Sequence, residues 1–319
     1  MEKIEFEYKT LKQIGLINNN VPVYSILLLK DGRLISCQED TTIRVYDKLN
    51  FELKQIIPLH NRYITYITQL KNEKIITCSL DSTMKIIKLN DDYSYFIEQI
   101  LDEHQYFVMK VIEIYNRKLI SCSGDKTIKI WGLEKKNNLY QFELCIFVNK
   151  NSIDSIIEIP KKNEILSASS FGRKVFFFDI INYSIECTLF DISCCCFYSN
   201  SLCLINDELV GISGNNIYYV INCNNYQLSQ KFMYGNTLTS YKLSNGKIIV
   251  GIMGGLMFYK IKSNNLIQDE YSESFIHDKE ISCIIESKNE YYNNKKLIIT
   301  CSLDSTIKFF VEKKNLKNI

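Results

Sequence analysis

Residues 120–131 read Ile-Ser-Cys-Ser-Gly-Asp-Lys-Thr-Ile-Lys-Ile-Trp, and close copies of this stretch begin at Ile35, Ile76 and Ile299. The first three copies start 41 and 44 residues apart. A period of that length indicates one supersecondary unit that buries its apolar surface only against further copies of itself. The sequence therefore predicts a repeat fold, and repeat folds of this kind serve mostly as binding platforms.

The composition predicts that each unit is built from strands. Hydrophobic residues make up 46% of the 319 residues and only 3 residues are Pro, so the chain has ample material for a continuous core. The 21 Tyr and 17 Phe favour strands over helices, and no long segment repeats apolar residues at period 3.6. In the second unit, alternation and turn signals mark four strands, at residues 64–67, 74–78, 84–89 and 93–101. We expect an all-β fold of four-stranded antiparallel meanders.

The units can be counted from the aspartate of each copy, or from the residue that takes its place. These positions are Asp40, Asp81, Asp125, Gly172, Gly214, Gly254 and Asp304, spaced by 41, 44, 47, 42, 40 and 50 residues. We assign the long last interval to a polar loop at residues 288–296. The spacing predicts seven units.

The sequence also predicts how the array closes. Residues after Val311 are nearly all polar, so the seventh unit lacks a fourth strand. At the other end of the chain, Leu11-Lys12-Gln13-Ile14 repeats the outer-strand sequence Leu53-Lys54-Gln55-Ile56. An N-terminal strand that completes the last unit would remove an open edge on which other chains could pair.

These units resemble the WD40-repeat (WD-repeat) β-propellers, most closely in units two, three and seven. The resemblance implies a seven-bladed β-propeller that forms a single domain over residues 1–319, with a buried network of His, Ser or Thr, Asp and Trp in its blades. The matching residues are His104, Ser121, Asp125 and Trp131 in unit three, His60, Thr77 and Asp81 in unit two, and His277, Thr300 and Asp304 in unit seven. Unit one has asparagines in place of the His, and units four to six lack the network.

A His beside an Asp and a Ser or Thr is also compatible with a catalytic triad. Here the arrangement occurs three times at the repeat period and uses all 3 histidines of the chain, which a single active site would not produce. An aspartate that accepts hydrogen bonds from the His and from the turn amides would instead fasten each turn to the strand below it. Because no nucleophile elbow, phosphate loop or Cys-x-x-Cys pair is present, we predict no catalytic residue, no metal ligand and no cofactor.

The cysteines of the repeat are expected to be structural, whereas the role of a cysteine triplet is open. Cys37, Cys78, Cys122 and Cys301 each lie three residues before an aspartate of the repeat, so we expect them to be equivalent, buried and apolar in character. The triplet Cys194-Cys195-Cys196 is open to lipidation or redox chemistry. A semi-buried loop in a reducing cytosol is the interpretation we favour for it.

Charge and hydropathy exclude several classes of partner from the prediction. The net charge is +2, from 38 basic and 36 acidic residues, without the basic stripe that nucleic-acid binders usually carry. The N-terminal segment has no signal-peptide pattern, and no apolar run approaches the roughly 20 residues that span a bilayer. We expect a cytoplasmic protein with protein partners, no nucleic acid and no membrane, whose propeller is monomeric within a larger complex.

In WD40 propellers the narrow face often carries the partner site; the loops entering each first strand and the turns holding the aspartate form it. The candidates at these positions are Tyr63, Leu80, Phe107, Phe171, Glu280 and Leu303. Aromatic residues are enriched at interface cores, although such side chains could instead fold over the rim and cap the core. We therefore predict a non-catalytic scaffold that binds a protein or peptide on this face.

A substrate receptor of a ubiquitin ligase is the alternative function. Receptors of this family that dock on one cullin adaptor carry Trp-Asp-x-Arg at the end of a third strand. The matching stretches here are Tyr46-Asp47-Lys48-Leu49, Trp131-Gly132-Leu133-Glu134 and Phe178-Asp179-Ile180-Ile181, none of which places the Arg. No F-box-like helical segment precedes the repeats, so we favour the scaffold. An enzyme is the remote alternative.

Overall fold

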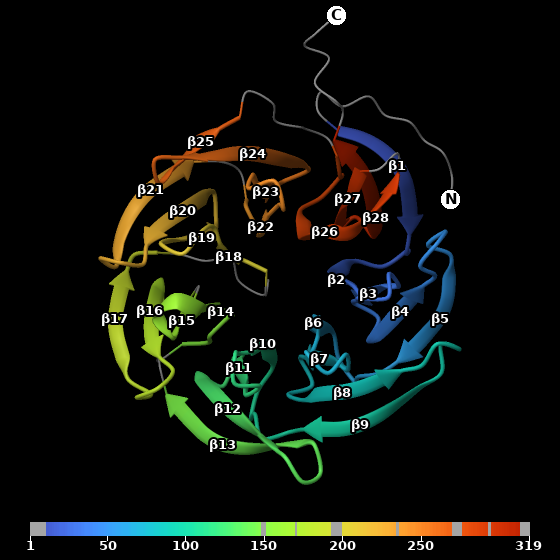
Figure 1. The fold of residues 1–319 in the computed structure, drawn as a ribbon, viewed down its shortest axis with the longest axis horizontal. Helices are drawn as coiled ribbons and strands as arrows, with labels where there is room; N and C mark the ends of the chain where they lie inside the picture. The colour runs from blue at the N-terminus through green and yellow to red at the C-terminus, as the bar shows by residue number, and fades with distance from the viewer. Residues whose placement is uncertain are drawn as a thin grey trace, which may run out of the picture.

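The fold is a ring of seven four-stranded antiparallel sheets arranged as the blades of a propeller around a central axis (Figure 1). This computed structural model describes residues 11–147, 151–169, 171–192, 200–233, 236–269, 276–292 and 295–312. In every blade the strands lie in a meander from the axis to the rim. The predicted all-β, seven-bladed architecture is confirmed.

The strands follow the chain from blade to blade. Blade one holds β2 (Val23–Leu28), β3 (Leu34–Gln38), β4 (Thr42–Tyr46) and β5 (Leu53–Pro58); blade two β6 (Ile64–Gln69), β7 (Ile75–Ser79), β8 (Met84–Leu89) and β9 (Tyr95–Leu101); blade three β10 (Val108–Glu113), β11 (Leu119–Ser123), β12 (Thr127–Glu134) and β13 (Leu139–Phe147). Blade four holds β14 (Ser155–Ile159), β15 (Glu164–Ser169), β16 (Lys174–Asp179) and β17 (Ile185–Phe190); blade five β18 (Leu202–Leu204), β19 (Leu209–Gly214), β20 (Ile217–Asn222) and β21 (Gln227–Met233). Blade six holds β22 (Thr239–Lys242), β23 (Ile248–Ile252), β24 (Gly255–Lys262) and β25 (Asn265–Gln268); blade seven β26 (Ile281–Tyr292), β27 (Lys295–Ser302), β28 (Thr306–Glu312) and β1 (Leu11–Asn18). A 3-10 turn, η1 (Pro160–Lys162), joins β14 to β15.

Strand β1 closes the ring. It is the outermost strand of blade seven and pairs with β28 from Leu11 opposite Glu312 to Asn18 opposite Thr306. Its side chains alternate between the buried and the half-buried side, beginning with Leu11, which is fully buried. The prediction that an N-terminal strand completes the last blade is confirmed.

The apolar core of the described residues is divided into seven clusters, each shared by two neighbouring blades. Between blades two and three, for example, Leu70 and Ile76 pack with Trp131 and Tyr140. Each sheet is thus covered on both faces by its neighbours, which is why the unit cannot be stable alone. The repeat cysteines Cys37, Cys78, Cys122 and Cys301 are fully buried in these clusters.

One local prediction was wrong. The insert at residues 288–296 is not simply a loop, because β26 runs on to Tyr292 and β27 begins at Lys295, and the insert contains no Pro or Gly to stop the pairing. In blades five and six the turn where the aspartate would lie is shorter, since Gly214 pairs with Ile217 and Ile252 with Gly255. Only two residues remain in each of those turns, so Gly214 belongs to a strand.

No helix in the described ranges is long and apolar enough to cross a membrane.

Candidate functional site

The network of blade three joins a loop, a strand and a turn. The Nδ1 atom of His104 lies 2.7 Å from Oδ2 of Asp125, and its Nε2 atom lies 2.7 Å from Oγ of Ser121. The indole Nε1–H of Trp131 donates to the same Oγ at 2.9 Å. Because the carboxylate accepts from Nδ1–H, the Nε2 lone pair is left to accept from the hydroxyl, which assigns His104 as neutral.

Blades two and seven repeat this geometry. His60 lies 2.8 Å from both Asp81 and Thr77 through its two ring nitrogens. His277 lies 2.9 Å from Asp304 and 2.8 Å from Thr300 in the same way. The structure thus brings together the network residues expected in all three blades.

The surroundings of the networks fix their charge states. Burial lowers the pKa of His60, His104 and His277, which favours the neutral imidazole. Burial alone would raise the pKa of their aspartate partners, but the hydrogen bond from each His, with those from the turn, holds the carboxyl pKa well below its usual range. Both ring nitrogens of each His are therefore engaged, and the geometry is suited to holding the turn in place.

A basic residue four positions after the aspartate was missed in the sequence. Lys85, Lys129 and Lys308 each donate from Nζ to the backbone oxygen of the residue just before the network His. In blade one, Arg44 donates instead to the backbone oxygen of Asn19, the residue in place of the His, at 2.9 Å. The signal was present, because the copies all place Arg or Lys after Thr-Ile or Thr-Met.

Blade one has a network of its own in which Asn19 replaces the His. Its Oδ1 atom accepts from the Tyr46 hydroxyl at 2.6 Å and from the Arg44 guanidinium at 2.9 Å. Arg44 also pairs with Asp40 at 2.7 Å, and Asn19 is buried. A substitution at Asn19 should therefore lower stability, because the buried Tyr46 hydroxyl would lose its acceptor and Arg44 would lose one of its acceptors.

We expect His104→Ala to lower the free energy of unfolding by about 1–3 kcal/mol, because Asp125 and Ser121 lose a buried partner. Asn19→Ala should cost a similar amount for the same reason. Urea denaturation followed by tryptophan fluorescence measures both. The control is Gln105→Ala, next to His104 but exposed, which should change stability by less than about 0.5 kcal/mol. Equal losses in the control and in His104→Ala would contradict the network assignment.

The narrow-face candidates occupy two positions of the repeat, one before the innermost strand and one in the turn that carries the aspartate. The backbone N–H of Leu80 donates to the oxygen of Tyr63 at 2.9 Å, and that of Gly124 to the oxygen of Phe107 at 2.9 Å. Leu303 and Glu280 pair in the same way at 3.1 Å. Each pair ties the loop before the innermost strand to the turn that carries the aspartate. From here on, the narrow face means the surface of these loops and turns.

The side chains on the narrow face differ in exposure. Tyr63 and Phe171 are exposed, with 40% and 65% of their surface accessible, whereas the remaining candidates are half-buried: Leu80, Phe107, Glu280 and Leu303. Two further exposed residues were missed, namely Tyr106 and Met253. None of the six candidates is buried inside a blade.

Local packing holds two of these aromatic rings. The Tyr63 ring stacks on Tyr24 of the neighbouring blade, with centroids 6.1 Å apart. The Phe107 ring lies over Gly124, where an added Cβ would sit 2.3 Å from Cε2 of the ring. Glycine at this position of the turn is thus what allows Phe107 to lie there. The rings are held in place before any partner binds.

The arrangement of metal-ligating side chains and cysteines can be described for part of the chain. Within the described ranges, no three His, Cys, Asp or Glu side chains are grouped so as to hold a metal ion. The described cysteines are free thiols. The triplet Cys194-Cys195-Cys196 lies outside the described residues, so its interpretation stays a prediction.

The comparisons with known proteins agree with this geometry. The family model "WD domain, G-beta repeat" matches residues 11–47 and 97–132. Each match begins in an outer strand and runs through the first three strands of the next blade, β1 to β4 and β9 to β12. Among solved structures, the crystal structure of the WD40 β-propeller domain of Doa1 is similar, with a TM-score of 0.77 and 16% sequence identity over 96% of this chain and 99% of that chain. No curated protein sequence matches the chain.

Proposed function

We propose that this chain, a WD40-repeat β-propeller, is a non-catalytic scaffold whose narrow face holds a partner protein or peptide. Propellers of this fold generally bind other proteins. One observation carries the proposal. The repeat places Tyr63 and Phe107 at the same position of blades two and three, and Phe171 at the turn position of blade four; Tyr63 and Phe171 are exposed and Phe107 is half-buried. Such aromatic anchors are typical of the centre of a binding interface.

The fixed position of the rings supports the same proposal. A ring that is already packed loses little conformational freedom when a partner covers it, so more of the contact energy remains for affinity. Tyr63 also lies close enough to Glu39 for its hydroxyl to hydrogen-bond that carboxylate, which raises the pKa of Tyr63. The proposed site therefore combines apolar anchors with an acidic rim that also includes Glu280.

We expect the triple variant Tyr63→Ala, Phe107→Ala, Phe171→Ala to lose its partners in an affinity pull-down analysed by quantitative mass spectrometry. The matched control is Phe96→Ala, Ile100→Ala, Phe142→Ala, which removes three exposed apolar side chains from the outer strands β9 and β13. Proteins depleted more than about tenfold by the first variant and retained by the control would be narrow-face partners, since losing one anchor typically costs more than 1 kcal/mol. Equal depletion by both variants would refute the proposal. The cytoplasmic location and the monomeric state of the propeller stay predictions.

A further inference from the structure

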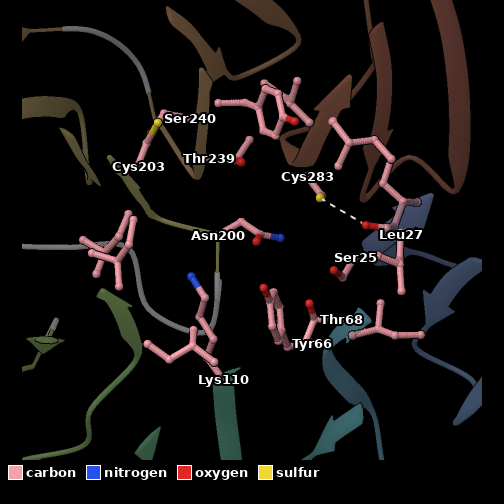
Figure 2. A pocket seen from close by; sticks show the side chains of 18 of the residues that line it. Ser25, Leu27, Tyr66, Thr68, Lys110, Asn200, Cys203, Thr239, Ser240 and Cys283 are labelled. Atoms are coloured by element: carbon pink, nitrogen blue, oxygen red, sulfur yellow. Dashed lines mark hydrogen bonds between the residues drawn. The ribbon is translucent and has the colours of Figure 1, made fainter. Parts of the chain in front are cut away.

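The central channel contains a cavity that is separate from the narrow-face aromatic residues. Its volume is about 430 Å³, and residues of the innermost strands of all seven blades, or next to them, line it (Figure 2). Much of its wall is apolar, including Ile67, Ile112, Ile156 and Ile284. Against this wall, each polar group that lacks a partner is a candidate for recognising a ligand.

Lys110 of β10 is the first such group. Only 5% of its surface is accessible, and Figure 2 shows its nitrogen pointing into the cavity. The Nζ atom lies 5.4 Å from the centroid of the Tyr66 ring, and none of the ion pairs between described residues includes Lys110. A buried ammonium group without a counter-ion is costly, and burial lowers the pKa of Lys110 to about 8.

Two further hydrogen-bond donors at the same cavity also lack a partner. The Asn200 amide nitrogen and the Thr239 hydroxyl are buried and have no hydrogen-bond partner among the described residues. Both line the same cavity as Lys110, and Figure 2 shows Asn200 projecting toward its middle. Blade three supplies the cation, while blade six and the entry to blade five supply the donors. The buried hydroxyls of Ser25 and Ser240 on the same wall also lack a partner among the described residues. Buried polar groups are nearly always satisfied in native proteins, so this set around one cavity indicates a missing hydrogen-bond partner.

We propose that the channel binds a small carboxylate monoanion with a short aliphatic body. Its carboxylate group accepts from the Lys110 ammonium and the Asn200 amide, and its aliphatic part lies along the isoleucines. One buried cation matches one negative charge. A phosphate dianion would call for further cations or a cradle of backbone N–H groups, as in the usual phosphate sites, and the cavity wall adds only Lys242, whose side chain is exposed.

Isothermal titration calorimetry of the full chain with sodium butyrate tests the proposal. We expect a saturable heat with one site per chain, and no binding of butyramide, which has the same shape without the charge. Lys110→Met should weaken butyrate binding by roughly 10- to 100-fold, the typical worth of a charge-assisted hydrogen bond. Lys242→Met, the control in the same channel, should change the affinity by less than about threefold, as for an exposed ion pair.

Several results would overturn the site. Butyrate binding of unchanged affinity in Lys110→Met, or no saturable heat with the wild type, would contradict the proposal that Lys110 binds a carboxylate in the channel. Loss of binding in Lys242→Met alone would move the anion to the exposed lysine. Tighter binding of inorganic phosphate than of butyrate would refute the carboxylate class. A failure here leaves the narrow-face proposal intact, because the two sites share no side chain.

Discussion

Deleting residues 1–18 should lower the melting temperature by roughly 10 °C or more. The deletion removes β1, so β28 loses its outer neighbour and Leu11 leaves the core between blades six and seven. Losing a ladder of backbone hydrogen bonds and a buried leucine corresponds to several kcal/mol, and each kcal/mol shifts the melting temperature of a chain of this size by roughly 2–4 °C. Differential scanning calorimetry measures the change.

The control for this deletion is removal of residues 1–10, which leaves all of β1 in place. We expect its melting temperature to stay within about 2 °C of that of the full chain. The larger deletion should also aggregate on size-exclusion chromatography, because an unpaired β28 is an open sheet edge. Equal melting temperatures for the two deletions would show that β1 does not close the ring.

Lys110→Met should make the free protein more stable, by on the order of 3 kcal/mol at pH 7. The pKa of Lys110 falls from 10.5 to about 8 because burial penalises the charged ammonium, and each pKa unit corresponds to about 1.4 kcal/mol. Methionine has a similar length and no charge to desolvate. Urea denaturation without added ligand measures the gain, and a less stable variant would contradict the assignment of Lys110 as an unpaired buried cation.

The pH dependence provides a second measure of the same group. The folded protein releases the Lys110 proton near pH 8, whereas the unfolded chain keeps it up to the ordinary pKa of 10.5. Between these values the unfolded state binds more protons, so the stability of the wild type should rise with pH. Lys110→Met should lack that rise when both proteins are denatured in urea from pH 7.5 to 10. Parallel curves for the two proteins would refute the shift.

The blade count, the closure of the ring and the three His networks could all be predicted from the sequence, because each depends on a sequence motif that recurs along the chain. Leu11-Lys12-Gln13-Ile14, for instance, repeats an outer-strand sequence and so predicts that β1 is an outer strand, as its pairing with β28 shows. The network of blade one was missed because Asn19 replaces the ring of the His with an amide oxygen. That oxygen accepts hydrogen bonds from Tyr46 and Arg44. Because this combination of residues occurs in no other repeat, the repeat pattern could not predict it.

The channel was missed for a different physical reason. Residues of the innermost strands face either a neighbouring blade or the axis, and the sequence does not say which positions meet across the axis. Lys110 comes from blade three and Asn200 lies next to blade five, so their nearness follows from ring closure alone. In the sequence, Lys110 is one of 38 basic residues and carries no motif.

The pairing of β1 with β28 also matters for synthesis in the cell. About 300 residues separate these strands along the chain, so β1 leaves the ribosome long before its partner exists. At roughly 5–20 residues per second, the delay is about 15–60 s. During that time the apolar side of the nascent strand has no native neighbour and is open to chaperones. Closure of the ring therefore waits until β28 has been synthesised, however early the first blades form.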